Sequence, residues 1–432
     1  MEASNETGSV PFKSASWAKA NRYEPGEELH NRATQFVKTV KWDLLAFRCA
    51  KLRGNIPCQF EEKYSVGHFN MVRHLVFQDG TSWIARLRMP SLDSEVRDSD
   101  VLESDQIIKV EVASMKFLRA RTCIPVPTVH HWSLDKTNEI GAPYILMDYI
   151  DGTTANDLQD AKGCENESFG TPEQDRTFRE QMASIQVELA SLKFDKIGSL
   201  YQDEESLKFY IGPDLATRKG PWESSTSYYA DLAENAMKEC VSHGKRALQE
   251  RPSFAIPVLF MHLMSLYGDP SSVKGPFGLA NLDMGAHNLL VNDNFEIVGV
   301  IDFDGLMAAP IELIAQFPEL TGLDREMPYV VETRPLALQR IDKVAPKLAE
   351  YQKMIEAAEA TLASHDVQSQ SDYQDRANRF GKLMLTDRTV ILYGLLSYQS
   401  QQKSVNDQVM ASYVAMLRKH FKSQDSQLSA GP

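Results

Sequence analysis

The sequence predicts an α+β protein with two lobes, in which a small β-rich lobe is followed by a larger helical lobe. Two extended runs, 63–77 and 82–88, flank the pair Asp79-Gly80, and Asp-Gly between extended runs is a strong signal for a β-hairpin. Beyond residue 151 the apolar residues recur mainly at helical spacing. The chain has 432 residues, 43% of them hydrophobic, which is enough for two packed cores.

The small lobe is predicted to span residues 28–150, and the segment ahead of it, 1–27, is predicted to be disordered. Apolar residues at helical or alternating spacing, with turn residues between them, define the elements of this lobe. In chain order they are a helix over 28–52, the hairpin of 63–88, a helix over 106–121 and a strand over 144–149. Asp151-Gly152 then ends the lobe as a linker.

The helical lobe is predicted over 151–422, followed by a disordered tail at 423–432. A polar connector at 166–175 precedes its helices. These are expected at 178–192, 228–251 and 254–267, and again after Pro335 on either side of a polar break at 364–374. The apolar stripe of the last two helices is short, which favours a helix pair packed in the core over a coiled-coil partner helix.

The acidic residues between positions 283 and 302 form the motif with the clearest chemistry. Asp283 is followed five positions later by Asn288, and Asp302 lies behind a β-rich segment. That segment is expected to form a hairpin that returns Asp302 to the side of Asn288. Phosphoryl transfer needs a group that orients a hydroxyl and oxygen ligands for Mg²⁺. The spacing therefore predicts a catalytic loop over 281–288, with Asp283 as the catalytic residue and Asn288 as a metal ligand, and Asp302 as a second metal ligand after the hairpin.

Each of these residues taken alone is explained better by ordinary loop structure. Asp and Asn are common at turns and at helix N-caps, so a lone Asp302 or Asn288 has no functional meaning. The three residues together, at this spacing and around a hairpin, favour a site for ATP and magnesium.

The motif resembles the catalytic loop of the aminoglycoside phosphotransferase and choline-kinase-like superfamily, particularly its fungal branch. The family form is His-Gly-Asp-Leu-x-x-x-Asn followed by Ile-Asp-Trp, and here Asn281 stands at the His position and Phe303 at the Trp position. The resemblance implies a bilobal protein-kinase-like fold. Further similar segments follow in the family's order, namely 66–70, 83–90, 111–118, 122–127, 143–152, 194–200, and Pro310, Glu312 and Phe317-Pro318.

The position of Arg86 in the hairpin, together with the resemblance, implies that it stands where kinases usually carry a phosphate-binding Lys. Glu111 on the following helix is its expected partner. An Arg offers a bidentate fork to phosphate, so the phosphate contact can be kept. The alternative is a surface ion pair of little consequence.

Three more parts of the site follow from the resemblance. Gly67 and Asn70 are expected in the loop that covers the phosphates, although a plain β-turn explains a single glycine almost as well. Met147 and Tyr149 are expected to form the hinge that hydrogen-bonds adenine, or else an ordinary strand before the linker. Asn281 is expected to support the catalytic loop, because its amide can both donate and accept hydrogen bonds.

Composition limits the partners. The net charge is −13, from 46 Lys and Arg against 59 Asp and Glu, which argues against nucleic-acid binding. An acidic surface is compatible with an amine-bearing small-molecule substrate, but the ordinary solubility of a cytosolic protein explains it equally and is preferred. Early acidic residues at the N-terminus do not indicate a secretory signal, and no apolar window suits a bilayer span. The spacing of the five cysteines indicates neither a disulfide framework nor a zinc site. The expectation is a cytoplasmic protein that binds no nucleic acid and no membrane; a protein partner is unknown.

The first functional hypothesis is an ATP- and Mg²⁺-dependent phosphotransferase that transfers the γ-phosphate to a hydroxyl of a small molecule. Asn281 in place of His keeps a second hypothesis open, a degenerate kinase-fold protein that binds a nucleotide, a metabolite or a protein without phosphoryl transfer. A third is a kinase-fold enzyme that uses ATP for another chemistry, such as nucleotidyl transfer. The acceptor is not identified by these residues.

Overall fold

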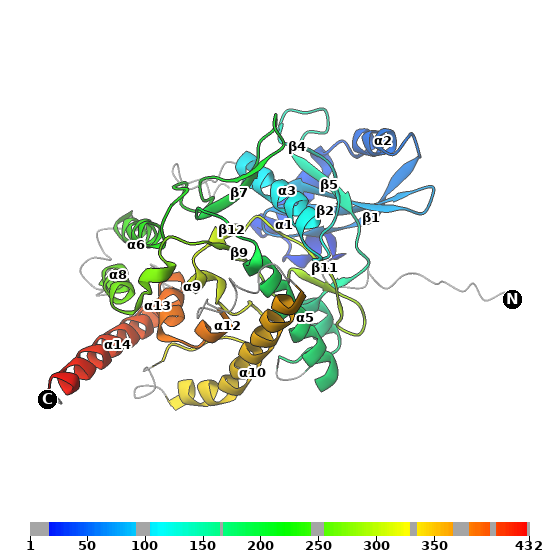
Figure 1. The fold of residues 1–432 in the computed structure, drawn as a ribbon. Coiled ribbons are helices and arrows are strands. Elements are labelled where there is room, and N and C mark those ends of the chain that lie inside the picture. Colours follow the sequence, from blue (N-terminus) through cyan, green and yellow to red (C-terminus); the bar gives the residue numbers. More distant parts are fainter. Residues whose placement is uncertain are drawn as a thin grey trace. The chain divides into compact units, whose positions relative to one another are not determined.

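A computed structural model describes residues 17–91, 104–164, 167–242, 255–328, 335–365, 380–397 and 403–429 (Figure 1). The chain forms two compact units. The first contains the described residues up to Phe178 together with Tyr201–Phe209 and Met284–Gly305, and the second contains Arg179–Leu200, Tyr210–Asp283 and the residues from Leu306 onward. This division differs from the predicted boundary at residue 150, because the hairpin that carries Asn288 and Asp302 packs with the first unit.

An antiparallel five-stranded sheet is the centre of the first unit, with strand order β1-β2-β3-β5-β4. The predicted hairpin is confirmed as β2 and β3, paired from Asn70↔Arg88 to Val76↔Ser82. Strand β4 was not predicted, and all five of its residues are only half-buried. The strands are β1 (Cys58–Val66), β2 (Asn70–Phe77), β3 (Ser82–Arg88), β4 (Val129–Ser133) and β5 (Tyr144–Asp148).

Helices cover both faces of this sheet. Alternate residues such as Ala85 and Leu87 face a core shared with the N-terminal helices, while Ile145 faces α3 (Ser104–Arg121). The single helix predicted over 28–52 is two helices, α1 (Glu28–Thr39) and α2 (Trp42–Leu52). The break occurs because Val40 is extended and buried, and the Lys41 N–H donates to the Ile140 carbonyl at 3.0 Å.

The segment before α1 is not wholly irregular, which differs from the expectation for residues 1–27. A short 3-10 helix, η3 (Lys19–Arg22), places Ala20 in the core of the first unit. Residues 1–16 lie outside the described part of the chain.

The hairpin of β10 (Leu289–Val291) and β11 (Ile297–Val300) completes the first unit. It forms a three-stranded sheet with β6 (Thr153–Thr154), which leads into α4 (Ala155–Ala161). Gly152, just before β6, lies against this hairpin so closely that a Cβ there would be 2.8 Å from Val298 Cγ2. The linker after β5 is therefore packed directly on the strands that lead to Asp302.

The second unit is mainly helical. It surrounds strands β9 (Gly278–Asn281) and β12 (Leu306–Ala309), which pair with each other, and β12 also pairs with β7 (Gly198–Gln202). Strand β8 (Phe209–Ile211) completes the order β8-β7-β12-β9. The helical elements are α5 (Pro172–Ser191), from Arg179 on, and α6 (Ser225–Ser242), α8 (Ile256–Tyr267), η6 (Pro270–Ser272), α9 (Ile311–Ile314), α10 (Pro335–His365), α12 (Phe380–Leu383), α13 (Asp387–Leu396) and α14 (Lys403–Ser429).

Two boundaries in the helical part differ from the prediction. Helix α5 begins at Pro172, inside the predicted connector, because Thr171 and Gln174 exchange hydrogen bonds as a capping box. The predicted tail begins inside α14, which continues to Ser429. The end of the predicted helix 228–251 and most of the predicted break at 364–374 lie outside the described residues.

Candidate active site

Arg86 is the centre of the candidate site in the first unit. Its neighbours Ala85 and Leu87 face the core with α1 and α2, so Arg86 projects from the opposite face of β3. Its Nη1 donates to Oε1 of Glu111 on α3, and its Nη2 donates to Oδ1 of Asp302 at 2.9 Å. Arg86 is 8% exposed and Glu111 3%. The predicted pair is confirmed, and the alternative of a surface ion pair is wrong.

Asn70, at the start of β2, is a third partner of this guanidinium. With the amide oriented so that its oxygen faces Arg86, Asn70 Oδ1 accepts from Nη2 at 2.7 Å and from Nε at 3.1 Å. The residue predicted in the phosphate-covering loop therefore contacts the predicted phosphate-binding side chain. Arg86 is held by groups from β2, α3 and the segment after β11.

The charges around Arg86 set its ionisation. Burial lowers the pKa of Arg86, but the charges of Asp302, Glu111 and Asp304 outweigh this effect and leave the pKa raised. Burial raises the pKa of Glu111, while Arg86 opposes the rise and Asp302 and Asp304 add to it. Glu111, Asp302 and Asp304 also act on the nearby Arg88, so three carboxylates face two guanidinium groups.

Asn288 and Asp302 are brought together as the sequence predicts. Strands β10 and β11 pair with Leu289 opposite Val300, and the Ile301 N–H donates to the Asn288 carbonyl at 3.0 Å. Asp302 has a φ of +62°, a left-handed conformation that Asp adopts more readily than most residues.

The donors available for a metal ion are an amide oxygen from Asn288 and a carboxylate from Asp302. Both are hard oxygen ligands, which Mg²⁺ prefers, and Mg²⁺ commonly uses only one or two carboxylates because it retains several waters. In the part of the chain that the structure describes, no group of three or more His, Cys, Asp or Glu side chains gathers as a metal site. The donor set therefore fits magnesium by its chemistry, and the role of each ligand stays a prediction.

The turn between β1 and β2 carries Gly67. Its N–H donates to the Asn70 carbonyl at 2.9 Å, and Arg32 of α1 donates to the carbonyl of His68 in the same turn. A Cβ added at Gly67 would come no closer than 3.9 Å to another group, the Asn70 carbonyl oxygen. The packing of the turn thus leaves open space beside Gly67, as a loop that approaches phosphates requires.

The predicted hinge residues lie at the end of β5. Met147 is paired on both sides, with β3 and with β4, and the Tyr149 N–H donates to the Ser82 carbonyl at 3.2 Å. The backbone of Met147 and the Tyr149 N–H thus make hydrogen bonds within the sheet, which agrees with the alternative of an ordinary strand before the linker. Among the described residues Ile150 makes no backbone hydrogen bond, and the hinge role of Met147 and Tyr149 stays a prediction.

Asn281 and Asp283 lie at the end of β9 in the second unit. Asn281 pairs with Leu306 of β12, and its Oδ1 accepts the Asp283 N–H at 3.2 Å. This hydrogen bond is the local support expected of Asn281. The catalytic role of Asp283 is not tested by this contact and stays a prediction.

Two charged residues near Arg86 had no predicted role. Arg88 lies on the same face of β3, and its guanidinium is 4.5 Å from the ring centroid of Phe69 in the β1–β2 turn. Asp304 acts on both Arg86 and Glu111. Arg88 was predictable beside Arg86, because residues two apart in a strand lie on the same face. The two-residue spacing of Asp302 and Asp304 would likewise have indicated a second acidic residue near Arg86.

Comparison with known proteins identifies the family. The model of the phosphotransferase enzyme family matches residues 78–313, which is more than half of the 432 residues. The chain belongs to this family. Membership confirms the predicted resemblance, and with the sheet and helices described above it confirms the predicted α+β protein-kinase-like fold class.

Curated relatives of this phosphotransferase-family chain match over short stretches. The protein named "Altered inheritance of mitochondria protein 9, mitochondrial" from Debaryomyces hansenii is 32% identical over 140 residues, which is 32% of this chain and 21% of the relative. A subtelomeric hrmA-associated cluster protein of Aspergillus fumigatus is 28% identical over 148 residues, 34% of this chain and 26% of the relative. The matches thus span between a fifth and about a quarter of these relatives' lengths.

Solved structures also match the chain, at lower sequence identity. The macrolide 2'-phosphotransferase MphH of Brachybacterium faecium is 13% identical, with a TM-score of 0.41 over 86% of this chain and 98% of that one. A putative fructosamine-3-kinase of Thermobifida fusca is 15% identical, with a TM-score of 0.42 over 85% and 98%. An aminoglycoside phosphotransferase APH(4)-Ia, in a ternary complex with AMP-PNP and hygromycin B, is 13% identical, with a TM-score of 0.41 over 81% and 98%.

The expected cytoplasmic location is contradicted by the comparisons. The matching proteins of Debaryomyces hansenii and Meyerozyma guilliermondii are both named as mitochondrial. The expectation came from the acidic, polar N-terminus, and such a composition does not identify a compartment. In the described part of the chain no helix has both the length and the apolar character to cross a bilayer.

Proposed function

We propose that this chain is an ATP- and Mg²⁺-dependent phosphotransferase that transfers the γ-phosphate to a hydroxyl of a small molecule. The observation that carries the proposal is the buried pair of Arg86 and Glu111, in which Arg86 also holds the half-buried Asp302 beside Asn288 in the first unit. A fixed cation on the sheet and a carboxylate next to an amide oxygen are the parts that phosphoryl transfer requires. Membership of the phosphotransferase family supports the same reaction class.

The residues have separate tasks in this proposal. Bound ATP supplies the phosphoryl group, and Mg²⁺ neutralises part of its charge. Arg86 offers Nη2 to phosphate oxygens in place of Asp302, while Glu111 keeps Nη1 in position. Asp302 and Asn288 supply oxygen ligands to the metal.

Two segments orient the substrates in this proposal: the end of β9 contacts the acceptor, and the linker after β5 contacts ATP. Asp283 accepts the proton of the acceptor hydroxyl, with its backbone fixed by Asn281. The backbone groups of Ile150, which are outside the sheet, face the adenine edge in this proposal. The hydrogen bond from Asp283 to Asn281 favours a working enzyme over the degenerate alternative, because an Asn at this position still supports the loop.

Magnesium-dependent nucleotide binding is the first test. Calorimetry with a non-hydrolysable ATP analogue should show binding that needs Mg²⁺, and Asp302→Asn should weaken it at least about tenfold by removing the charged ligand. Asp293→Asn is a matched control, since Asp293 is an exposed acid in the turn of the same hairpin. An affinity that changes neither on removal of magnesium nor in Asp302→Asn would contradict the proposal. Release of AMP rather than ADP during turnover would indicate nucleotidyl transfer instead.

A further inference from the structure

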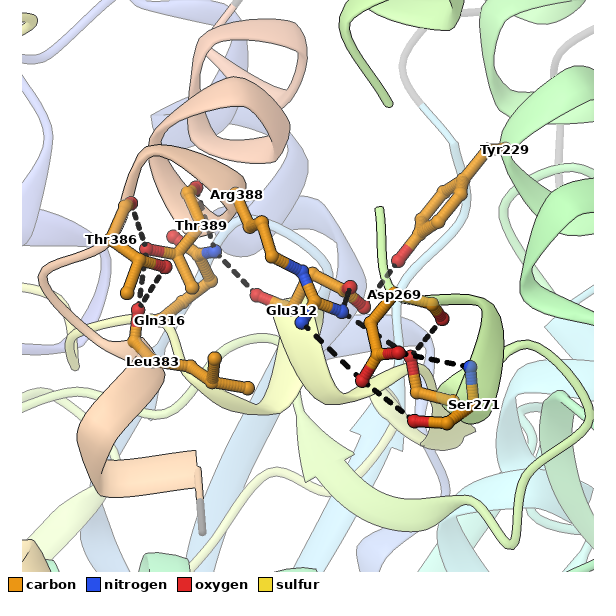
Figure 2. A network of polar contacts seen from close by, with 10 residues as sticks. Tyr229, Asp269, Ser271, Glu312, Gln316, Leu383, Thr386, Arg388 and Thr389 are labelled. Carbon is orange, nitrogen blue, oxygen red and sulfur yellow. Dashed lines mark hydrogen bonds and ion pairs between the residues drawn. The ribbon is translucent and has the colours of Figure 1, made fainter. Parts of the chain in front are cut away.

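A largely buried polar network joins α6, η6, α9 and α13 in the second unit (Figure 2). Arg388 of α13 donates through Nη2 to Oε1 of Glu312 on α9, and Tyr229 of α6 donates its hydroxyl to Oε2 of the same carboxylate at 2.7 Å. The side chains of Arg388 and Glu312 are 12% and 4% exposed. The motif analysis noted Glu312 as part of the family pattern, and none of these groups has a task in the proposed reaction.

Arg388 also reaches the segment that leads into β9. Nη2 donates to Ser272 Oγ at 3.3 Å, and Nη1 lies 3.9 Å from Asp269 Oδ2, just before η6. Asp269 in turn fixes η6 by accepting the Ser271 N–H at 2.9 Å. Figure 2 shows the guanidinium between Glu312 and Asp269. One side chain therefore joins the segment that precedes β9 to the helix that follows β12.

A second contact joins α9 to α13. Gln316 Nε2 donates to the Glu312 carbonyl at 2.6 Å and to the Thr389 carbonyl, next to Arg388, at 3.2 Å. Burial, and then the charge of Glu312, raise the pKa of Tyr229 well above its usual range, so its hydroxyl keeps the proton that it donates. Both carboxylate oxygens of Glu312 thus have donors, which a buried charge needs.

The network is connected to Asp283 through β9. Helix α9 packs against the start of this strand, where a Cβ on Gly278 would be 2.9 Å from Ile314 Cδ1. The strand pairs with β12 along its length and ends at Asn281, whose side chain accepts the Asp283 N–H. A shift of α9 or η6 would therefore move the strand that presents Asp283.

We infer that Arg388 is a positioning residue that fixes β9, and with it Asp283, by joining Glu312 on α9 to Ser272 and Asp269 at η6. A buried ion pair is often no more stabilising than apolar residues of the same volume, so we assign to Arg388 the arrangement of the groups around it rather than stability. The role assigned to Asp283 rests on the proposed function, but the fixing of β9 does not.

Hydrogen exchange measured by mass spectrometry on the full chain tests this inference. In Arg388→Met the amides of 278–283 should exchange at least about tenfold faster than in the unaltered protein, while those of 348–362 in α10 keep their protection. Arg388→Lys, which retains a charge but loses the fork, should lie between the two. Lys419→Met is the control, because Lys419 makes an exposed ion pair with Asp387, beside Arg388.

Unchanged exchange at 278–283, or an equal loss of protection at 348–362, would overturn the inference. If Arg388→Met does not fold, Glu312→Gln keeps the shape of the network and should still raise exchange at 278–283 several-fold.

Turnover separates this inference from the proposed function. In Arg388→Met, ATP consumption should fall at least about tenfold while the affinity for the magnesium-bound analogue changes less than about twofold. Equal losses of turnover and affinity would contradict a positioning role for Arg388. If the unaltered protein consumes no ATP, the proposed function fails, and the exchange measurement alone decides whether Arg388 fixes β9.

Discussion

At the scale of single residues, Arg86 shows how burial changes the meaning of an ion pair. An exposed Arg and Glu contribute between about 0 and 1 kcal/mol to the free energy of unfolding, whereas removing one partner of a buried pair leaves a charge without compensation. Arg86 compensates Glu111 on one side and Asp302 on the other. Its removal is therefore expected to affect folding as well as the proposed phosphate binding.

We expect Arg86→Met to lower the free energy of unfolding by about 3–5 kcal/mol, because Glu111 is left buried without its partner. The double variant Arg86→Met with Glu111→Leu should recover most of this loss, since both charges are then gone. Urea unfolding followed by circular dichroism measures both. A loss below about 1 kcal/mol in the single variant would mean that the pair behaves like an exposed one.

At the scale of elements, close packing of the linker on a hairpin positions the proposed metal ligands. Gly152 allows the chain after β5 to contact β10 and β11, where a Cβ would meet Val298 Cγ2 at 2.8 Å and the Val291 carbonyl oxygen at 3.3 Å. A side chain at Gly152 would push the hairpin away from the linker. Because that hairpin carries Asn288 and leads to Asp302, the packing bears on the site itself.

Gly152→Ala should lower the free energy of unfolding by about 1–3 kcal/mol, the usual cost of overpacking. Adding Val298→Ala removes the nearest atom and should restore part of the loss. Gly67→Ala is the comparison, since the nearest atom to its Cβ would be 3.9 Å away, and its stability should change by less than about 0.5 kcal/mol. Thermal unfolding of the four proteins tests this, and a Gly152→Ala variant as stable as Gly67→Ala would contradict the packing argument.

At the scale of the whole molecule, the chain has two compact units, and each contains buried side chains of its own. The first is built on the five-stranded sheet, with a core that includes Met71, Leu87 and Tyr144. The second buries Phe260, Tyr351 and Tyr413 among its helices. Two cores in one chain allow unfolding in more than one step.

Scanning calorimetry should therefore give a calorimetric enthalpy larger than the van't Hoff enthalpy. A magnesium-bound ATP analogue at about 100 times its dissociation constant should stabilise the unit that binds it by about 2.7 kcal/mol. We expect this stabilisation to raise the melting temperature of the first unit, because Arg86, Asn288 and Asp302 all belong to it. A single transition with equal enthalpies would show that the units unfold together.

The sequence by itself determined the features that depend on local pattern. The Asp-Gly hairpin of β2 and β3 and the hairpin that joins Asn288 to Asp302 were predictable, because neighbouring residues carry the turn chemistry and the alternation that define them. The partnership of Arg86 with Glu111 followed from the family resemblance. The family was also recognisable from an ordered set of short motifs.

Only the tertiary structure decided the features that depend on residues far apart in the chain. The helix break at Val40 needs a carbonyl from Ile140, and the placement of 284–305 with the first unit follows from packing. The network of Arg388, Glu312 and Tyr229 joins residues separated by as many as 83 positions in one hydrogen bond. No local pattern encodes such contacts, because burial and charge pairing are settled only when distant elements pack together.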